Sequence, residues 1–116
     1  MEAVLRRLIG ERWPLEGKLR LDLPEIAENG SAVPLTVEVR SPMTEADHVR
    51  AVHVLAEANP LPEVVTFRFT PAAGKAVAAT RIRLARSQTV TALAELSDGS
   101  VHIARREVRV TVGGCG

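Results

Sequence analysis

Hydrophobic and polar residues alternate along most of this chain with a period of two. The alternation is clearest around Leu21, Val37 and Phe67, where every second side chain is apolar. Because successive side chains of a strand point to opposite faces, this pattern predicts strands with one buried and one solvated face. About seven segments fit such strands: residues 18–23, 33–40, 48–56, 65–70, 76–84, 88–96 and 100–112.

Turn-forming residues separate the predicted strands. Gly, Pro, Asn, Asp and Ser gather at residues 28–31, 41–42, 59–62, 71–74 and 97–100, and each of these residue types favours a turn. The Asp-Gly pair in the last of these segments lies between two strand patterns and predicts a β-hairpin. This succession of short strands predicts an all-β fold, an immunoglobulin-like antiparallel β-sandwich.

Two segments depart from the regular alternation. Residues 48–56 do not keep their apolar side chains on one parity, which a β-bulge or a helical turn would explain. Residues 2–9 place Val4, Leu5, Leu8 and Ile9 on one face of a short helix. So short a helix is marginal alone, and we therefore expect it either to cap its own domain or to help bind a partner.

The length and composition predict one domain with a modest core. Of the 116 residues, 46% are hydrophobic but only 3% are aromatic, so Val, Leu, Ile and Ala must fill the interior. We expect an N-terminal helix and linker over residues 1–17 and an immunoglobulin-like sandwich over 18–112. A short flexible arm over 113–116 completes the expected division.

Several function classes are disfavoured by the overall composition. The net charge of +1 gives no concentrated basic footprint for nucleic acid. No apolar run approaches the roughly 20 residues that cross a bilayer, and no signal peptide is evident. A single cysteine excludes an intrachain disulfide and a multi-cysteine zinc site. An intermolecular disulfide or a free thiol remains.

The last four residues carry the clearest chemical signal. Cys115 has Gly114 before it and Gly116 after it, and Gly113 begins the run. Glycine gives the backbone its widest freedom, whereas a structural cysteine is normally buried. The pattern predicts a swinging arm that presents a thiol to other proteins, although C-terminal glycines are often only disordered ends.

The chemistry of this tail favours a carrier over a nucleophilic enzyme. A free thiol has a pKa of about 8.5, so little thiolate forms at neutral pH. The tail holds no His or Lys, and the nearby terminal carboxylate disfavours the thiolate. Activation must therefore come from whatever the tail docks into, whereas a catalytic cysteine is held beside its base.

Other titratable residues give no comparable signal. The histidines are expected to be ordinary surface or partly buried side chains, and the acidic residues before the second strand to lie in a solvated turn. The residues concerned are His48, His53, His102, Asp22, Glu25 and Glu28. We therefore expect no catalytic residue, no metal ligand and no bound cofactor in this chain.

Motifs through the body and the tail together resemble the SoxY family, the sulfur-carrying subunits of the bacterial Sox thiosulfate-oxidation system. The resemblance runs from about residue 3 to the end. In the body it rests on residues 16–18, 21–24, 27–30, 33–34, 41–44, 47–49, 59–60, 80–85 and 96–99. The family ends in Gly-Gly-Cys-Gly-Gly, and residues 113–116 match its first four positions without the final glycine.

This resemblance implies a covalent sulfur carrier rather than an enzyme. Thiosulfate would be joined oxidatively to Cys115, and a hydrolase would then release sulfate and leave a persulfide for further oxidation. The family works in the periplasm, which it reaches with a cleaved leader that this chain lacks. Its implied partners are SoxZ, an immunoglobulin-like subunit of a heterodimer, a c-type cytochrome and a dimanganese hydrolase. The metals and haems belong to those partners.

Alternative functions are consistent with parts of the pattern. A secreted sandwich module could use Cys115 for an interchain disulfide. A ubiquitin-like sulfur donor would carry a glycine thiocarboxylate, but Cys115 and Gly116 follow the glycine pair here. A stand-alone thiol enzyme lacks a fixed base.

Overall fold

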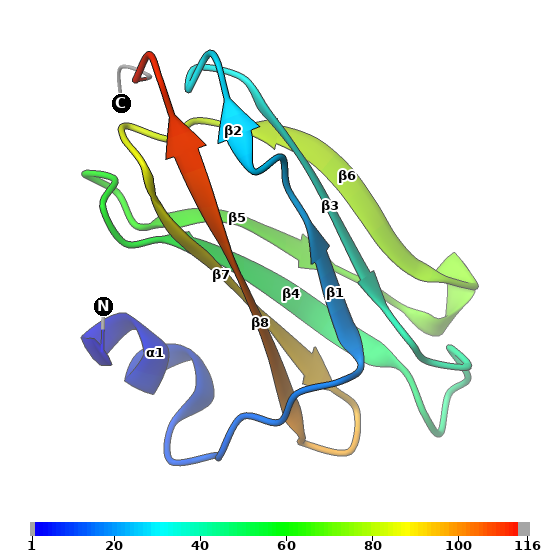
Figure 1. Ribbon diagram of the computed structural model, residues 1–116. Helices are drawn as coiled ribbons and strands as arrows, with labels where there is room; N and C mark the ends of the chain where they lie inside the picture. The colour runs from blue at the N-terminus through cyan, green and yellow to red at the C-terminus, as the bar shows by residue number, and fades with distance from the viewer. Residues whose placement is uncertain (1, 114–116) are drawn as a thin grey trace.

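The computed structural model describes residues 2–113 and has the predicted architecture, a β-sandwich preceded by one short helix (Figure 1). The helix α1 spans Glu2–Ile9, as the apolar pattern predicts. The strands are β1 (Leu19–Asp22), β2 (Ile26–Ala27), β3 (Val33–Val39), β4 (Val49–Ala56), β5 (Glu63–Arg68), β6 (Ala76–Ile82), β7 (Gln88–Leu96) and β8 (Val101–Val110), with a 3₁₀ turn at Pro71–Ala73.

The strands described within residues 2–113 form two sheets. One has three strands in the order β1-β3-β6, and the other has five in the order β2-β8-β7-β4-β5. Neighbours pair antiparallel except for β2, which runs parallel to the end of β8. Leu15 also makes an isolated parallel bridge to His102. The predicted antiparallel sandwich is therefore present, and the parallel pairing described within residues 2–113 is limited to two short segments beside β8.

The irregular segment 48–56 is a strand with bulges rather than a helical turn. Its pairing with β7 shifts register between Val49 and Ala51, and its pairing with β5 shifts between Val54 and Leu55. An extra residue in one strand changes which side chains face inward. The shifts explain why the apolar residues of β4 do not keep one parity.

Aliphatic side chains fill the space between the sheets, as the composition predicts. Leu21, Leu35, Val37 and Leu96 are essentially inaccessible to solvent, and burying each such side chain contributes about 1.5–3 kcal/mol. The aromatic residues are marginal to this core. Phe67 and Phe69 only pack against its edge, while Trp13 is 84% exposed.

The helix caps its own domain. Ile9 is buried in a second cluster on the outer face of the five-stranded sheet, and other apolar residues of α1 pack partly against that cluster. The sheet contributes Leu55, Leu93, Val101 and Ile103. Because the apolar face of α1 is covered by this chain's own sheet, that face is not an open surface for a partner.

The predicted hairpin joins β7 to β8. Ser100 N–H donates to the Asp98 carboxylate over 2.8 Å, and Gly99 N–H donates to the Leu96 carbonyl over 3.0 Å. Gly99 has a φ of 86°, a conformation that glycine adopts without a steric penalty. This turn directs β8 back along β7 toward the other end of the sandwich.

Candidate functional site

The chain leaves the sandwich at the end of β8. After Val110 it continues through Thr111 and Val112 to Gly113, the last residue that the structure describes. We call residues 109–113, the end of β8 and the three residues that follow it, the arm root. Gly114, Cys115 and Gly116 lie outside the described residues, so the thiol and its flexible arm remain predictions.

One side of the arm root is hydrogen-bonded to the segment that contains β2. The bonds run from Arg109 N–H to Glu25 O (2.9 Å), from Thr111 N–H to Ala27 O (3.1 Å), from the Thr111 hydroxyl to Glu28 O (3.1 Å) and from Gly30 N–H to Val112 O (2.7 Å). Strand pairing therefore continues past the end of β8. It fixes the backbone of Thr111 and Val112 against residues 27–30.

The other side of the arm root faces the loop that joins β6 to β7. The Ser87 hydroxyl accepts a hydrogen bond from Val110 N–H at 2.7 Å. Leu84 N–H donates to Gly30 O at 2.8 Å and so ties this loop to the segment that holds Val112. The arm root lies between two backbone segments that are themselves joined.

An asparagine organises that loop from a distant part of the chain. The Asn59 side chain donates to Arg83 O over 2.7 Å and accepts from Ala85 N–H over 2.9 Å. It also accepts from Gln88, whose amide oxygen in turn accepts from Ala58 N–H. These bonds give the loop 83–88 a defined backbone path beside the arm root.

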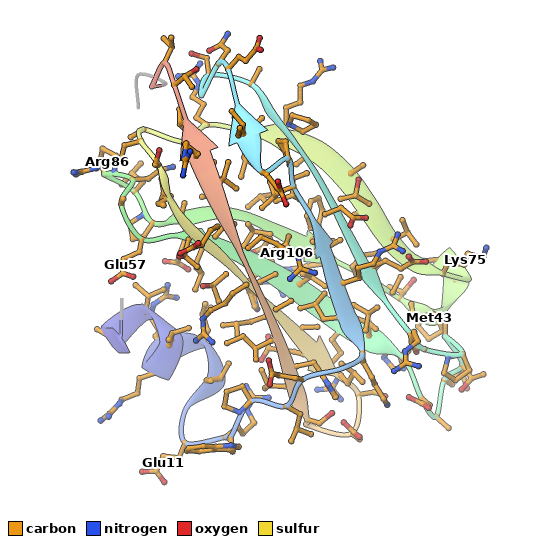
Figure 2. All side chains as sticks on the ribbon, viewed as in Figure 1. Glu11, Met43, Glu57, Lys75, Arg86 and Arg106 are labelled. Carbon is orange, nitrogen blue, oxygen red and sulfur yellow. The ribbon has the colours of Figure 1, made fainter. Side chains whose placement is uncertain are left out.

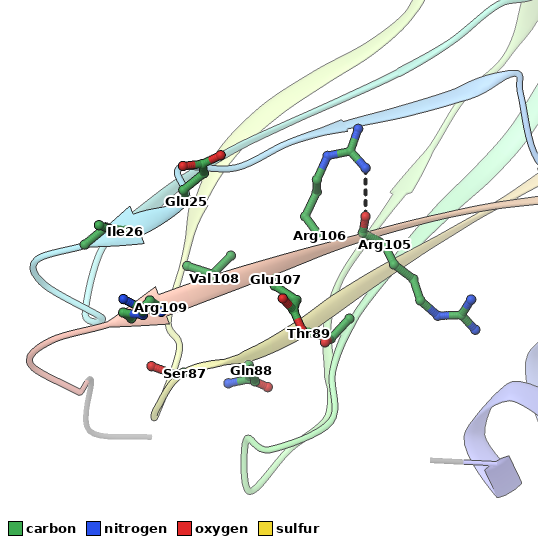
Figure 3. A pocket seen from close by; sticks show the side chains of 10 residues that line it. All are labelled: Glu25, Ile26, Ser87, Gln88, Thr89, Arg105, Arg106, Glu107, Val108 and Arg109. Carbon is green, nitrogen blue, oxygen red and sulfur yellow. Dashed lines mark hydrogen bonds between the residues drawn. The ribbon is translucent and has the colours of Figure 1, made fainter.

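A groove lies close to the arm root (Figure 3). It has a volume of about 740 Å³ and is lined by Glu25, Ile26, Ser87, Gln88, Thr89, Arg105, Arg106, Glu107, Val108 and Arg109. Ser87 lines the groove and also accepts the hydrogen bond from Val110 N–H at the arm root. Arg106 folds back to donate to the Arg105 carbonyl at 2.8 Å, as the dashed line in Figure 3 marks. The arginines of the groove are accompanied by two glutamates.

His53 is one of the histidines for which no functional role is predicted, and it has a defined structural role. It is only 5% exposed, and its Nε2 lies 2.8 Å from the Glu95 carboxylate while its Nδ1 lies 2.9 Å from the Thr66 hydroxyl. An ionised carboxylate only accepts hydrogen bonds, so Nε2 carries the hydrogen. In the neutral ring Nδ1 then accepts from Thr66. His53 is therefore more buried than the sequence analysis expected.

Arg12 completes this network and joins it to the helix. Its guanidinium contacts the second Glu95 oxygen at 2.8 Å and also donates to the carbonyls of Leu8 and Ile9, at the end of α1. Burial raises the pKa of Glu95, but the hydrogen bonds and charges of His53 and Arg12 outweigh burial and hold that pKa below its ordinary value. The network fastens α1 to the sheet.

The remaining candidates are dispersed. His48 lies near the Thr44 carbonyl, with Nδ1 at 3.1 Å, and Asp22 forms an exposed ion pair with Arg20. His102 is 5% exposed, and its Nδ1 has no hydrogen-bond partner among the described residues. Burial, followed by the charge of Lys18, lowers the pKa of His102.

Side chains that could hold a metal ion do not gather at one place in the described part of the chain. Glu11, Glu57, Lys75 and Arg86 lie at separate places on the periphery (Figure 2). Within residues 2–113 no three side chains of His, Cys, Asp or Glu are grouped closely enough to hold a metal ion. No helix in the same range qualifies as a membrane span.

Comparison with known proteins identifies the family. The family described as SoxY, sulfur oxidation protein SoxY, matches residues 5–115. Because this match includes nearly the whole chain, the protein belongs to the SoxY family. The resemblance and the fold class inferred from the sequence are thus confirmed. Among curated proteins none matches this chain.

Solved structures support the family and the fold. The sulfur carrier protein SoxY from Chlorobium limicola f thiosulfatophilum has 28% identity and a TM-score of 0.78, with 96% of each chain covered. Superoxide reductase (neelaredoxin) from Ignicoccus hospitalis has 18% identity and a TM-score of 0.71, covering 81% of this chain and 80% of that one. A putative superoxide reductase from Thermotoga maritima has 20% identity and a TM-score of 0.67, covering 84% and 87%. At such identities the reductases share only the fold.

The residues that hold the arm root could not be predicted from the sequence. Gly30 and Asn59 are named only as turn residues and within the segments of the family resemblance, Ser87 is not named, and nothing local in the sequence indicates that the three meet. Two segments of the family resemblance, residues 27–30 and 80–85, lie on either side of the arm root. Their presence in that resemblance is the signal that could have drawn attention to them.

Proposed function

We propose that this protein is a sulfur carrier of thiosulfate oxidation that holds its cargo covalently on Cys115. One observation carries the proposal. The SoxY family match extends to residue 115, and so includes the only cysteine of the chain. The described chain leads toward this cysteine from an arm root that is bonded to two loops of the sandwich.

The first step of the proposed cycle is an oxidation. The thiol of Cys115 and thiosulfate lose two electrons and one proton together, and a bond forms between the cysteine sulfur and the outer sulfur of thiosulfate. The product is a cysteine S-thiosulfonate. A c-type cytochrome partner accepts the two electrons.

The second step is a hydrolysis. Water attacks the sulfone sulfur, the bond between the two outer sulfur atoms breaks, and sulfate and a proton leave. A persulfide remains on Cys115, and its outer sulfur is oxidised and released in later steps. A dimanganese hydrolase partner carries out the sulfate-releasing step, so this chain is a substrate carrier and not an enzyme.

The proposed arm consists of Gly113, Gly114, Cys115 and Gly116, and the sandwich of residues 18–112 supports it. Small neighbours on either side of Cys115 suit entry into a narrow site on another protein. A thiol without a local base suits a carrier, because activation then occurs only where a partner supplies the base or positive charge. The carrier itself needs no cofactor for this role.

The proposal includes a partner and a compartment. A SoxZ-like immunoglobulin-fold subunit forms a heterodimer with this chain in the periplasm, without nucleic acid or membrane. Exposed apolar residues support a partner surface along β8, because Leu15 and Ile26 flank its outer edge and are 48% and 56% exposed. Expressed alone, the chain is expected to self-associate under reducing conditions, and a monodisperse monomer would count against the heterodimer.

Intact-mass measurement tests the proposed function. Protein isolated with its partners and exposed to thiosulfate is expected to carry a thiosulfonate or persulfide group, and peptide mapping is expected to place it on Cys115. The matched control is Cys115→Ser, which should unfold at the same temperature but carry no added sulfur. Added sulfur on the serine variant would overturn the proposal. A disulfide-linked dimer without added sulfur would instead favour the interchain-disulfide module.

A further inference from the structure

Gly113 lies against the backbone of the loop between β6 and β7. A Cβ atom built on Gly113 would overlap the carbonyl oxygen of Ala85 and would lie 3.3 Å from its carbonyl carbon. The obstacle is main chain, so rotation of a neighbouring side chain cannot relieve the overlap. Any residue other than glycine must displace either the arm root or this loop.

The need for glycine at this position is one of space rather than of backbone conformation. Gly113 is not among the described residues with positive φ, so an L-residue could adopt its backbone angles. The obstructing carbonyl belongs to a loop whose path is held by Asn59 and Ser87. Gly113 therefore packs closely onto a supported surface.

We infer that Gly113 is a positioning residue, which fixes where and in what direction the chain leaves the sandwich toward Cys115. The inference rests on the proposed carrier function, which gives the direction of the arm a purpose. In this role Gly113 permits close packing of the arm root against the Ala85 backbone.

A fixed Gly113 limits the reach of the thiol. Only one residue lies between Gly113 and Cys115 in the sequence, so the two Cα atoms are separated by at most about 7 Å. A partner enzyme must then approach the arm root closely to receive the cargo. The loops at residues 27–30 and 83–88, which surround the arm root, would lie next to that partner.

A pair of alanine variants tests the inference, because each adds one methyl group to one glycine. Gly113→Ala is expected to push the arm root away from Ala85 and to weaken the bond from Gly30 N–H to Val112 O. Forced overpacking is costly enough that hydrogen exchange at the Gly30 amide should accelerate about tenfold or more. Gly114→Ala is the matched control and should leave this exchange rate unchanged.

The second measurement compares two reactions of Cys115 in these variants. Alkylation by iodoacetamide is expected to proceed at the wild-type rate in both, since the thiol remains present and the reagent is small. Partner-catalysed loading with thiosulfate should fall about tenfold in Gly113→Ala, in proportion to the displaced population, and clearly less in Gly114→Ala.

The outcomes separate the inference from the function on which it rests. Unchanged Gly30 exchange in Gly113→Ala would overturn the close packing of the arm root. Accelerated exchange with unchanged loading would make Gly113 merely structural and overturn its positioning role. If the wild-type protein fails to load on Cys115, the carrier function falls, and the positioning role falls with it. The exchange measurement would still decide the packing of Gly113.

Discussion

The two ends of the described chain are attached to the same five-stranded sheet by different means. Helix α1 is attached through side chains, with Ile9 buried against Leu93 and Arg12 bonded to Glu95. The arm root is attached through backbone hydrogen bonds, and the side chains of Thr111 and Val112 remain exposed. One end is held by what its side chains bury and the other by the path of its backbone.

This difference determines which substitutions should matter at each end. A side-chain attachment is weakened by removing atoms, because the sheet beneath loses contacts and a cavity is left. A backbone attachment is little affected when a side chain is shortened, but it is disturbed by an added atom where the backbones approach closely. The N-terminal end suits a permanent cap, and the C-terminal end suits an arm whose side chains must pass into another protein.

The largest effect on stability is expected at the helix. Leu93 is inaccessible to solvent beneath α1, so Leu93→Ala should lower the free energy of unfolding by about 2–5 kcal/mol. Denaturant-induced unfolding measures this change. The matched control beside the arm root is Ile26→Ala, whose side chain is 56% exposed and whose effect should stay within about 0.5 kcal/mol. Equal effects from the two variants would contradict the comparison.

The next effect concerns the link between α1 and the sheet. Arg12→Ala removes the contact to Glu95 and the guanidinium hydrogen bonds to the Leu8 and Ile9 carbonyls, while the Ile9 carbonyl keeps the backbone N–H of residue 12 as a donor. We expect unfolding to require about 1–3 kcal/mol less, since hydrogen bonds to charged groups are involved. Arg20→Ala is the control, because its ion pairs are exposed and such pairs contribute about 0–1 kcal/mol. A loss no greater than that of the control would show that α1 does not depend on this network.

The architecture could be predicted from the sequence because long strands leave a repeated signal. The alternation around Leu21, Val37 and Phe67 reflects one buried face, and the lost parity of 48–56 reflects a real bulge. Strand β2 was missed because it has only two residues, which are too few to show a period. Its parallel pairing with β8 depends on where the chain crosses between sheets, which no local pattern reports.

The candidate site was predictable only in part, for a similar reason. Cys115 stands out by its composition and position, but the support of the arm root joins segments that are far apart in the sequence. Asn59 reaches Ala85 across 26 positions, and His53 reaches Glu95 across 42. Such contacts follow from strand register, so residue types alone could not indicate that an asparagine in one turn supports the loop under the arm.

Acid should weaken the body of the protein in two stages. The pKa of His102 is lowered by burial and by the charge of Lys18, although Asp98 opposes this. The folded state then binds fewer protons than the unfolded state, so stability falls as the pH drops below the ordinary His value of 6.5. Burial raises the pKa of Glu95, but His53 and Arg12 outweigh burial and lower it. The contribution of Glu95 to stability is therefore lost as the pH falls below the ordinary Glu value of 4.5.

Urea unfolding over a pH series measures these stages. His102→Gln should remove the change that begins below pH 6.5 and keep the later one that begins below 4.5. Glu95→Gln should do the reverse. A pH dependence that is identical in wild type and in His102→Gln would show that His102 does not contribute. Both groups lie away from the arm root, so Gly30 amide protection should change only as far as global stability does.

The smallest effect is expected at the arm root itself. Thr111→Val keeps the shape of the side chain but removes the hydroxyl that donates to the Glu28 carbonyl at 3.1 Å. Because Thr111 is exposed, water can replace this donor, and global stability should fall by no more than about 1 kcal/mol. The backbone bonds from Thr111 to Ala27 and from Gly30 to Val112 remain, so exchange at the Gly30 amide should rise only slightly. A loss of Gly30 protection as large as that expected for Gly113→Ala would mean that a side chain, and not the backbone path, holds the arm root, and the contrast between the two ends of the chain would no longer stand.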